Sequence, residues 1–145
     1  MTPDVNVLVA ASRTDHPHHA VARVWLEEVV ATAGAGMTVV LMPMVLASFL
    51  RLVTSPKVFQ MATPIANAVA FVDALLASPG VQLAPLGPEW PILRQLCLDK
   101  QLVGNSLPDA WLAAAVSQVG EHLVSFDRDF RSLLTRGQFT LLAPA

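Results

Sequence analysis

The chain has 145 residues, the length of one ordinary domain, and can bury a substantial core. Hydrophobic residues make up 54% of it and charged residues only 14%, against about 25% in a typical soluble domain. This apolar surplus favours a partner, either another protein or a second copy. The formal net charge of −2 excludes a general electrostatic hold on nucleic acid, so any such binding must use a local patch.

The composition also bears on where the protein works. The longest apolar stretch, 37–50, contains Thr38, Pro43 and Ser48 and is too short to cross a bilayer. The N-terminus has no basic leader and no small-residue cleavage site. Cys97 stands alone and forms neither an internal disulfide nor a thiolate metal site. We therefore expect a cytoplasmic protein without a membrane partner.

Strand-like and helix-like segments alternate along the chain. The apolar, β-branched run 5–10 is typical of a buried parallel strand, and a helix with an apolar stripe over 21–29 follows it. The pattern then predicts, in order, a strand at 38–41, helices at 44–54 and 63–77, a strand at 81–84, helices at 88–100 and 108–119, a strand at 123–126, a short helical turn from 129 and a final strand at 139–142.

This order of elements predicts one three-layer α/β domain over residues 1–145, with a mainly parallel central sheet. No repeat, low-complexity segment or long linker divides the chain. In such folds, ligands bind in the crevice beyond the carboxyl ends of the strands.

Three aspartates stand at element junctions. Asp4 opens the first apolar run, Asp109 begins a helix that is otherwise nearly all apolar, and Asp127 directly follows a predicted strand. Each has a structural explanation alone, since acids suit the first turn of a helix and cap short turns. Together, two such charges ~4 Å apart cost about 4 kcal/mol at an effective dielectric of 20. A hard divalent cation with oxygen ligands offsets that cost, which points to metal-assisted chemistry on a phosphate.

Four blocks of sequence carry a family resemblance. They are Asp4-Val5-Asn6-Val7-Leu8, then the segments 49–59 (FLRLVTSPKVF) and 104–114 (GNSLPDAWLAA), and finally Ser125-Phe126-Asp127-Arg128-Asp129-Phe130. In order and spacing they resemble the PIN-domain ribonucleases, and within them the VapC-type toxins of bacterial toxin–antitoxin pairs. The resemblance spans nearly the whole chain.

By this resemblance, Asp4, Asp109 and Asp127 are the catalytic, metal-binding carboxylates, and Asp129 is a further ligand or an orienting group. Asn6 and Ser125 are expected to steady these carboxylates through hydrogen bonds.

Basic residues also stand near the matching blocks. Arg51, Lys57 and Arg128 are the expected contacts to RNA phosphates, and Arg131 and Arg136 are also expected to flank the acidic centre and hold phosphates.

One position departs from the family pattern. Many members carry a glutamate just before the Phe-Leu-Arg block, where this chain has Ser48, and no acid occurs anywhere in 29–72. Fewer carboxylates predict weaker affinity for a divalent ion. Ser48 is still expected to reach a metal-bound water.

The resemblance implies a mechanism and partners. A Mg²⁺ or Mn²⁺ ion activates a water for in-line attack on an RNA phosphodiester, leaving a 5′-phosphate and a 3′-hydroxyl. A small antitoxin covers the acidic site, and the toxin forms a homodimer.

Two other interpretations stay open at this point. A catalytically weakened PIN-like protein would bind an antitoxin or RNA without cutting, and Ser48 favours this alternative. A phosphoacceptor domain also places aspartates at strand ends, but it needs a lysine after a late strand. Lys57 and Lys100 instead fall in or beside helical segments.

Overall fold

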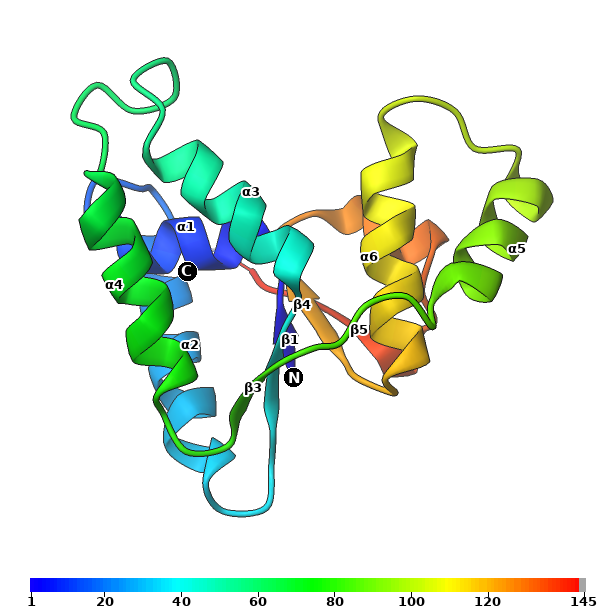
Figure 1. The fold of residues 1–145 in the computed structure, drawn as a ribbon, viewed down its shortest axis with the longest axis horizontal. Helices are drawn as coiled ribbons and strands as arrows, with labels where there is room; N and C mark the ends of the chain where they lie inside the picture. Colours follow the sequence, from blue (N-terminus) through cyan, green and yellow to red (C-terminus); the bar gives the residue numbers. More distant parts are fainter. Residues whose placement is uncertain (144–145) are drawn as a thin grey trace.

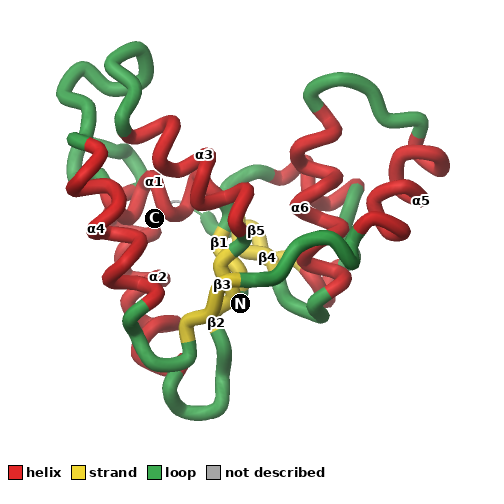
Figure 2. The backbone as a smooth tube through the Cα atoms, in the orientation of Figure 1, coloured by secondary structure: helices red, strands yellow, loops and turns green. Residues whose placement is uncertain are grey.

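The computed structural model describes residues 1–143. Five short strands lie at the centre of this part of the chain (Figure 2). They are β1 (Thr2–Pro3), β2 (Val39–Leu41), β3 (Val81–Leu83), β4 (Leu123–Ser125) and β5 (Phe139–Leu141). Strand β4 pairs in parallel with both β1 and β5, and β2 pairs in parallel with β3. The two groups meet where Val40 N donates to Met1 O at 3.0 Å. The expected parallel sheet is confirmed.

Helices cover both sides of these strands (Figure 1). Helices α1 to α4 lie on one side, and α5 and α6 lie on the other, which gives the three layers that the sequence predicts. The helices are α1 (Val5–Ser12), α2 (His19–Ala33), α3 (Pro43–Val53), α4 (Ile65–Leu76), α5 (Trp90–Lys100) and α6 (Ser106–Gln118), with two short 3₁₀ helices, η1 (Arg128–Ser132) and η2 (Arg136–Gln138).

The segment 5–10 corrects one prediction, because it is helix α1 and not a strand. Its apolar, β-branched composition reflects burial, since Val7, Leu8 and Ala10 are completely inaccessible to solvent. Asp4 caps the helix by accepting a hydrogen bond of 2.7 Å from Val5 N to Oδ1. The strand is only β1, just before Asp4. Asp4 therefore lies at the carboxyl end of a strand, the position where sites form in parallel sheets.

The tryptophans divide between core and surface. Trp25 packs against the core from a half-buried position. Trp90 is 62% exposed and Trp111 is 37% exposed. Helix α5 buries none of its residues, so this layer leaves apolar side chains on the surface. No helix within residues 1–143 has the length and hydropathy that a bilayer span requires.

Candidate metal centre

Two of the predicted acids come together because their strands are neighbours. Strands β1 and β4 run in parallel with Pro3 opposite Val124, and Asp4 N donates to Val124 O at 2.9 Å. Asp4 follows β1 directly, and Asp127 follows β4 after one intervening residue. Parallel strands bring their carboxyl ends to the same edge, so residues more than 120 positions apart reach one site.

Asp4 is a buried carboxylate, only 6% exposed. Burial raises its pKa and is the largest influence on it, hydrogen bonds from Ser125 and Val5 lower the pKa, and the negative charge of Asp127 raises it again. The net effect is a pKa above the ordinary value of 3.8. A nearby cation would therefore stabilise the ionised form of Asp4.

The Ser125 hydroxyl joins the residues around Asp4. It donates to Asp4 Oδ2 at 2.7 Å and accepts from Asp127 N at 2.9 Å and from Asn6 Nδ2 at 3.1 Å. Asn6 Oδ1 in turn accepts from Phe126 N at 3.2 Å. Ser125 therefore contacts Asp4 and Asp127 directly, and Asn6 is linked to both acids through Ser125.

Asp109 approaches the same point from the first turn of α6, on the other side of the sheet. The pKa of Asp109 is raised from 3.8 to about 6. Burial is the largest cause, and the negative charges of Asp4, Asp127 and Asp129 contribute the rest. Carboxylates influence one another this way only at short range. The structure thus gathers the four predicted acids into one cluster, which we call the acid cluster.

Asp127 and Asp129 have different surroundings within it. Asp127 caps η1 by accepting a hydrogen bond of 2.9 Å from Asp129 N at Oδ1. Asp129 itself is exposed. The capping function that the sequence also allowed for Asp127 is therefore present, and it leaves Oδ2 of Asp127 free of any hydrogen bond among the described residues.

The acid cluster suits a hard cation through its oxygen donors and its mutual repulsion. Within residues 1–143, no three His, Cys, Asp or Glu side chains stand close enough together to hold one ion directly. Magnesium usually retains several of its waters and binds proteins through few carboxylates. The arrangement therefore fits an ion held partly through water by Asp4, Asp109 and Asp127.

A cavity of about 730 Å³ opens beside the acid cluster. Asp4, Asp109, Ser48 and Arg51 all line it, together with an apolar wall that includes Trp90 and Trp111. Helix α3 thus places Ser48 in the same cavity as Asp4 and Asp109. Lys57 lies in the exposed turn after α3 and lines neither this cavity nor the one described next.

A second cavity of about 530 Å³ lies on the other side of Asp109. It is lined by Asp109, Asp129 and Arg128, and also by Asn105, Ser106 and Arg131. Asp109 therefore stands between an apolar cavity and a polar, arginine-containing one. The sequence reasoning did not single out Asn105 and Ser106, although they lie in the same block as Asp109, 104–114, at a helix start.

Glu89 is a further residue that the sequence reasoning missed. It is 6% exposed and accepts hydrogen bonds from Trp111 Nε1 at 2.9 Å and from Gly87 N at 2.6 Å. Burial acts to raise the pKa of Glu89, yet these hydrogen bonds lower it below the ordinary value. Glu89 ties the start of α5 to α6 two residues from Asp109. The sequence feature that could have identified Glu89 is the Gly87-Pro88-Glu89 turn before a helix.

Comparison with known proteins agrees with this architecture. The PIN domain family matches residues 1–133. Ribonuclease VapC31 of Mycobacterium tuberculosis is 44% identical over 130 residues, and Ribonuclease VapC25 of the same species is 42% identical over 128 residues, each match covering 88% of both chains.

Two solved structures share the fold. One is the M. tuberculosis toxin VapC20, which cleaves the sarcin–ricin loop, with a TM-score of 0.65, 18% identity and coverage of 99% of this chain and 98% of that one. The other is VapBC2 from Rickettsia felis bound to a promoter DNA fragment, with a TM-score of 0.61, 15% identity and 91% coverage of both chains. The chain therefore belongs to the PIN-domain family and, within it, to the VapC ribonucleases.

Proposed function

We propose that this chain is a metal-dependent endoribonuclease toxin that hydrolyses RNA phosphodiester bonds and is neutralised by a cognate antitoxin. The observation that carries the proposal is the acid cluster, in which the charges of Asp4, Asp127 and Asp129 all raise the pKa of Asp109. Asp4 and Asp127 lie at the carboxyl ends of parallel strands, and Asp109 and Asp129 add their charges from α6 and η1, so the acids together form a site for a cation. The 44% identical relative is named a ribonuclease, which supports the same activity here.

Each residue of the cluster has a defined task in this proposal. Asp4, Asp109 and Asp127 hold Mg²⁺ or Mn²⁺, with Asp129 as a further ligand or orienting group. When bound, the ion supplies a water of lowered pKa and offsets charge on the phosphate oxygens. Ser125 holds Asp4 in place by its 2.7 Å hydrogen bond and fixes the backbone of Asp127 with the same hydroxyl.

The substrate is held by charge beside this centre. Arg51 and Arg128 line the two cavities that flank Asp109, where guanidinium groups suit the phosphates on either side of the scissile bond. Lys57 would meet a phosphate farther along the strand. The expected products are a 5′-phosphate and a 3′-hydroxyl.

The apolar wall of the larger cavity supports an antitoxin as partner. Trp90 and Leu107 are 62% and 41% exposed at its rim, beside the acids that an inhibitor must cover. The Rickettsia felis structure, which shares this fold, is of VapBC2, a name that combines VapB with VapC. An apolar antitoxin segment seated in this cavity would block access to Asp4 and Asp109.

A homodimer has separate support. Ile65 and Val69 are 58% and 38% exposed and lie one helical turn apart at the start of α4, and Met61, in the segment before the helix, is 82% exposed. These exposed apolar side chains suit a second copy. Sedimentation of the wild type and of Ile65→Lys tests it: a monomer in the wild type would refute the homodimer.

The catalytic proposal is tested with Asp4→Asn and Asp109→Asn. Structured RNA is incubated with each variant in Mn²⁺ and in EDTA, and Asp73→Asn, an exposed acid on α4, is the matched control. We expect Mn²⁺-dependent cleavage by the wild type and the control, and a loss of at least about a hundredfold in both site variants. Full activity in either site variant would overturn the metal–carboxylate mechanism.

The alternative of a non-catalytic binder rests on Ser48, which leaves the acid cluster one carboxylate short of the usual family pattern. It predicts RNA or antitoxin binding without EDTA-sensitive cleavage in the same assay. The phosphoacceptor alternative loses its support, because neither lysine of the described chain lines the two cavities beside Asp109.

A further inference from the structure

We propose that Arg131 and Arg136 form a second RNA phosphate site, beyond the acid cluster, that positions one strand of the substrate. The inference deepens the proposed function and rests on it. It assigns a binding site to a pocket of about 590 Å³ lined by Arg131, Leu134, Thr135, Arg136, Phe139 and Leu141.

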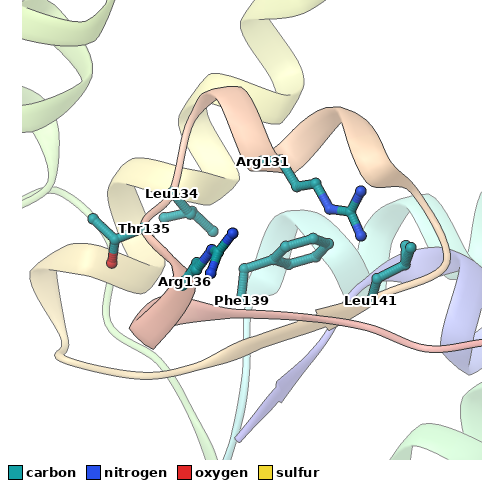
Figure 3. A pocket seen from close by; sticks show the side chains of 6 residues that line it. All are labelled: Arg131, Leu134, Thr135, Arg136, Phe139 and Leu141. Atoms are coloured by element: carbon teal, nitrogen blue, oxygen red, sulfur yellow. The ribbon is translucent and has the colours of Figure 1, made fainter.

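The pocket has the chemistry of an anion site. Figure 3 shows the guanidinium groups of Arg131 and Arg136 reaching in from two sides above the ring of Phe139. Among the residues that the structure describes, no acidic side chain lines the pocket. Within residues 1–143 neither arginine takes part in an ion pair, whereas Arg13 and Arg23 both do. Two unpaired guanidinium forks over one apolar floor suit the oxygens of a phosphodiester.

The pocket adjoins the proposed active site. Arg131 lines both this pocket and the 530 Å³ cavity that contains Asp109 and Arg128. Arg131 therefore links the cavity that contains Asp109 and Arg128 to the pocket that contains Arg136. The segment 128–138 carries three arginines and one aspartate in a chain whose net charge is −2. A local basic track is what a protein without general affinity for nucleic acid needs.

The backbone that carries the arginines is held firmly. Phe130 is 1% exposed and packs against Phe139 with ring centroids 6.0 Å apart, which fixes η1 on β5. Gln138 accepts from Thr135 N at 3.2 Å and donates to Ser117 Oγ at 3.0 Å, which ties η2 to α6. The same helix carries Asp109. The second phosphate site and the acid cluster are thus parts of one scaffold, as strand positioning requires.

An acidic protein segment would also be attracted to two arginines. The position beside the cavity that contains Asp109 favours RNA, because a phosphodiester placed at the acid cluster delivers its neighbouring phosphates along the surface to Arg131. Phosphate contacts of this kind fix register and carry no base preference. We therefore expect the site to act on single-stranded RNA of any sequence, and to matter only when the strand is long enough to reach it.

The test compares Arg136→Gln with Arg94→Gln. Arg94 is an exposed arginine of α5 that lines none of the three cavities discussed. A long, labelled single-stranded oligoribonucleotide of mixed sequence is titrated in EDTA over a range of salt concentrations. Each phosphate contact to single-stranded RNA contributes about 0.7 to the slope of log K against log salt. We expect Arg136→Gln to lower that slope by about 0.7 and to weaken binding several-fold, and Arg136→Lys to restore the slope.

A cleavage assay in Mn²⁺ separates this inference from the proposed function. We expect Arg136→Gln to raise KM for the long oligoribonucleotide, and to leave cleavage of a dinucleotide unchanged. If the wild type cleaves RNA and Arg136→Gln binds RNA with the same affinity and salt slope as the wild type, the second site is overturned and the nuclease proposal stands. If the wild type does not cleave RNA but Arg136→Gln shows a lowered salt slope, the nuclease proposal is overturned and the second site stands. Loss of binding to poly-glutamate, with RNA binding intact, would assign the pocket to an acidic protein and overturn the inference.

Discussion

Ser125 and Asp4 are joined by a hydrogen bond of 2.7 Å, from the serine hydroxyl to Oδ2, although they are 121 positions apart in sequence. The bond exists because β1 and β4 are parallel neighbours whose carboxyl ends coincide. The same hydroxyl accepts from Asp127 N at 2.9 Å. A single buried side chain therefore sets the positions of two acids that the proposed mechanism uses.

Replacing Ser125 by alanine is expected to impair metal binding more than folding. Asp4 would lose the hydrogen bond that lowers its pKa, and burial would then favour its protonated form. Loss of a partner that orients a metal ligand typically weakens metal affinity by about 10- to 100-fold, and loss of a hydrogen bond to a charged group costs about 1.5–3 kcal/mol of stability. Calorimetric titration with Mn²⁺ and urea unfolding measure the two effects. Ser78→Ala, which removes an exposed hydroxyl bonded to Ala74 O, is the control, and equal Mn²⁺ affinity in both variants would contradict the prediction.

The raised pKa of Asp109 predicts that both stability and metal binding depend on pH. Its pKa rises from 3.8 to about 6, so between these values the folded protein retains a proton that the unfolded chain has released. The stability of the metal-free protein should therefore increase as the pH falls through that window and decrease as the pH rises. Mn²⁺ competes with this proton, so its apparent affinity should fall by up to about tenfold for each pH unit below the pKa of about 6.

The variant Asp109→Asn checks the sign of this effect. At neutral pH without metal it removes a charge that the neighbouring acids repel, so we expect its thermal midpoint to exceed that of the wild type. The stability of the variant should also change less with pH across the same window. A wild type that is less stable at pH 5 than at pH 7, with the same trend in the variant, would show that another group controls the pH dependence.

The sequence anticipated the order of elements better than the identity of the first one. Segments such as 108–119 have long helical patterns bounded by proline, and the structure places α6 there. The run 5–10 has only an apolar, β-branched composition, which a fully buried helix and a buried strand share. Helix α1 is enclosed by neighbours, so burial and not periodicity determined its residues. Asp4 caps α1 by accepting a hydrogen bond from Val5 N, so the aspartate directly before the run was a signal for a helix start that the composition of the run outweighed.

Part of the site was predictable from the sequence, because part of it depends only on the order of strands. Asp4 and Asp127 stand next to strand ends, and strand ends converge in any parallel sheet. Asp109 approaches from the opposite layer because of how α6 packs. The sequence indicates this packing only through the family resemblance. The partly exposed position of Trp111 and its bond to Glu89 are tertiary relations with no periodic signal. That is why both were absent from the sequence reasoning.

Arg13 is expected to be a principal support of the loop between α3 and α4. It is 8% exposed and donates to Met61 O at 2.7 Å and to Thr63 Oγ1 at 3.1 Å, and its guanidinium lies 4.0 Å from the centroid of the Phe59 ring. Arg13→Ala leaves these acceptors without a buried donor and should cost about 2–4 kcal/mol of unfolding free energy. Urea unfolding measures it. Arg23→Ala, which breaks an exposed ion pair with Glu27, should leave the urea midpoint nearly unchanged, and a similar loss in both would refute the special importance of Arg13.

Ser48→Glu tests whether position 48 belongs to the metal centre. Ser48 lines the same cavity as Asp4 and Asp109, so a glutamate there would add a carboxylate to the acid cluster. Without metal the added charge should increase the repulsion, raise the pKa of Asp109 further and lower the thermal midpoint. With Mn²⁺ it should supply another oxygen ligand and tighten binding by about tenfold or more, since affinity for hard divalent ions rises with the number of ligand charges. Ala47→Glu, one residue earlier at an exposed position of α3, is the matched control and should change neither quantity in this way. A Mn²⁺ titration of Ser48→Glu that coincides with the wild type, in a protein of lowered midpoint, would place the serine near the acids but outside the ion's reach. The weaker affinity that we attribute to the missing glutamate would then need another cause.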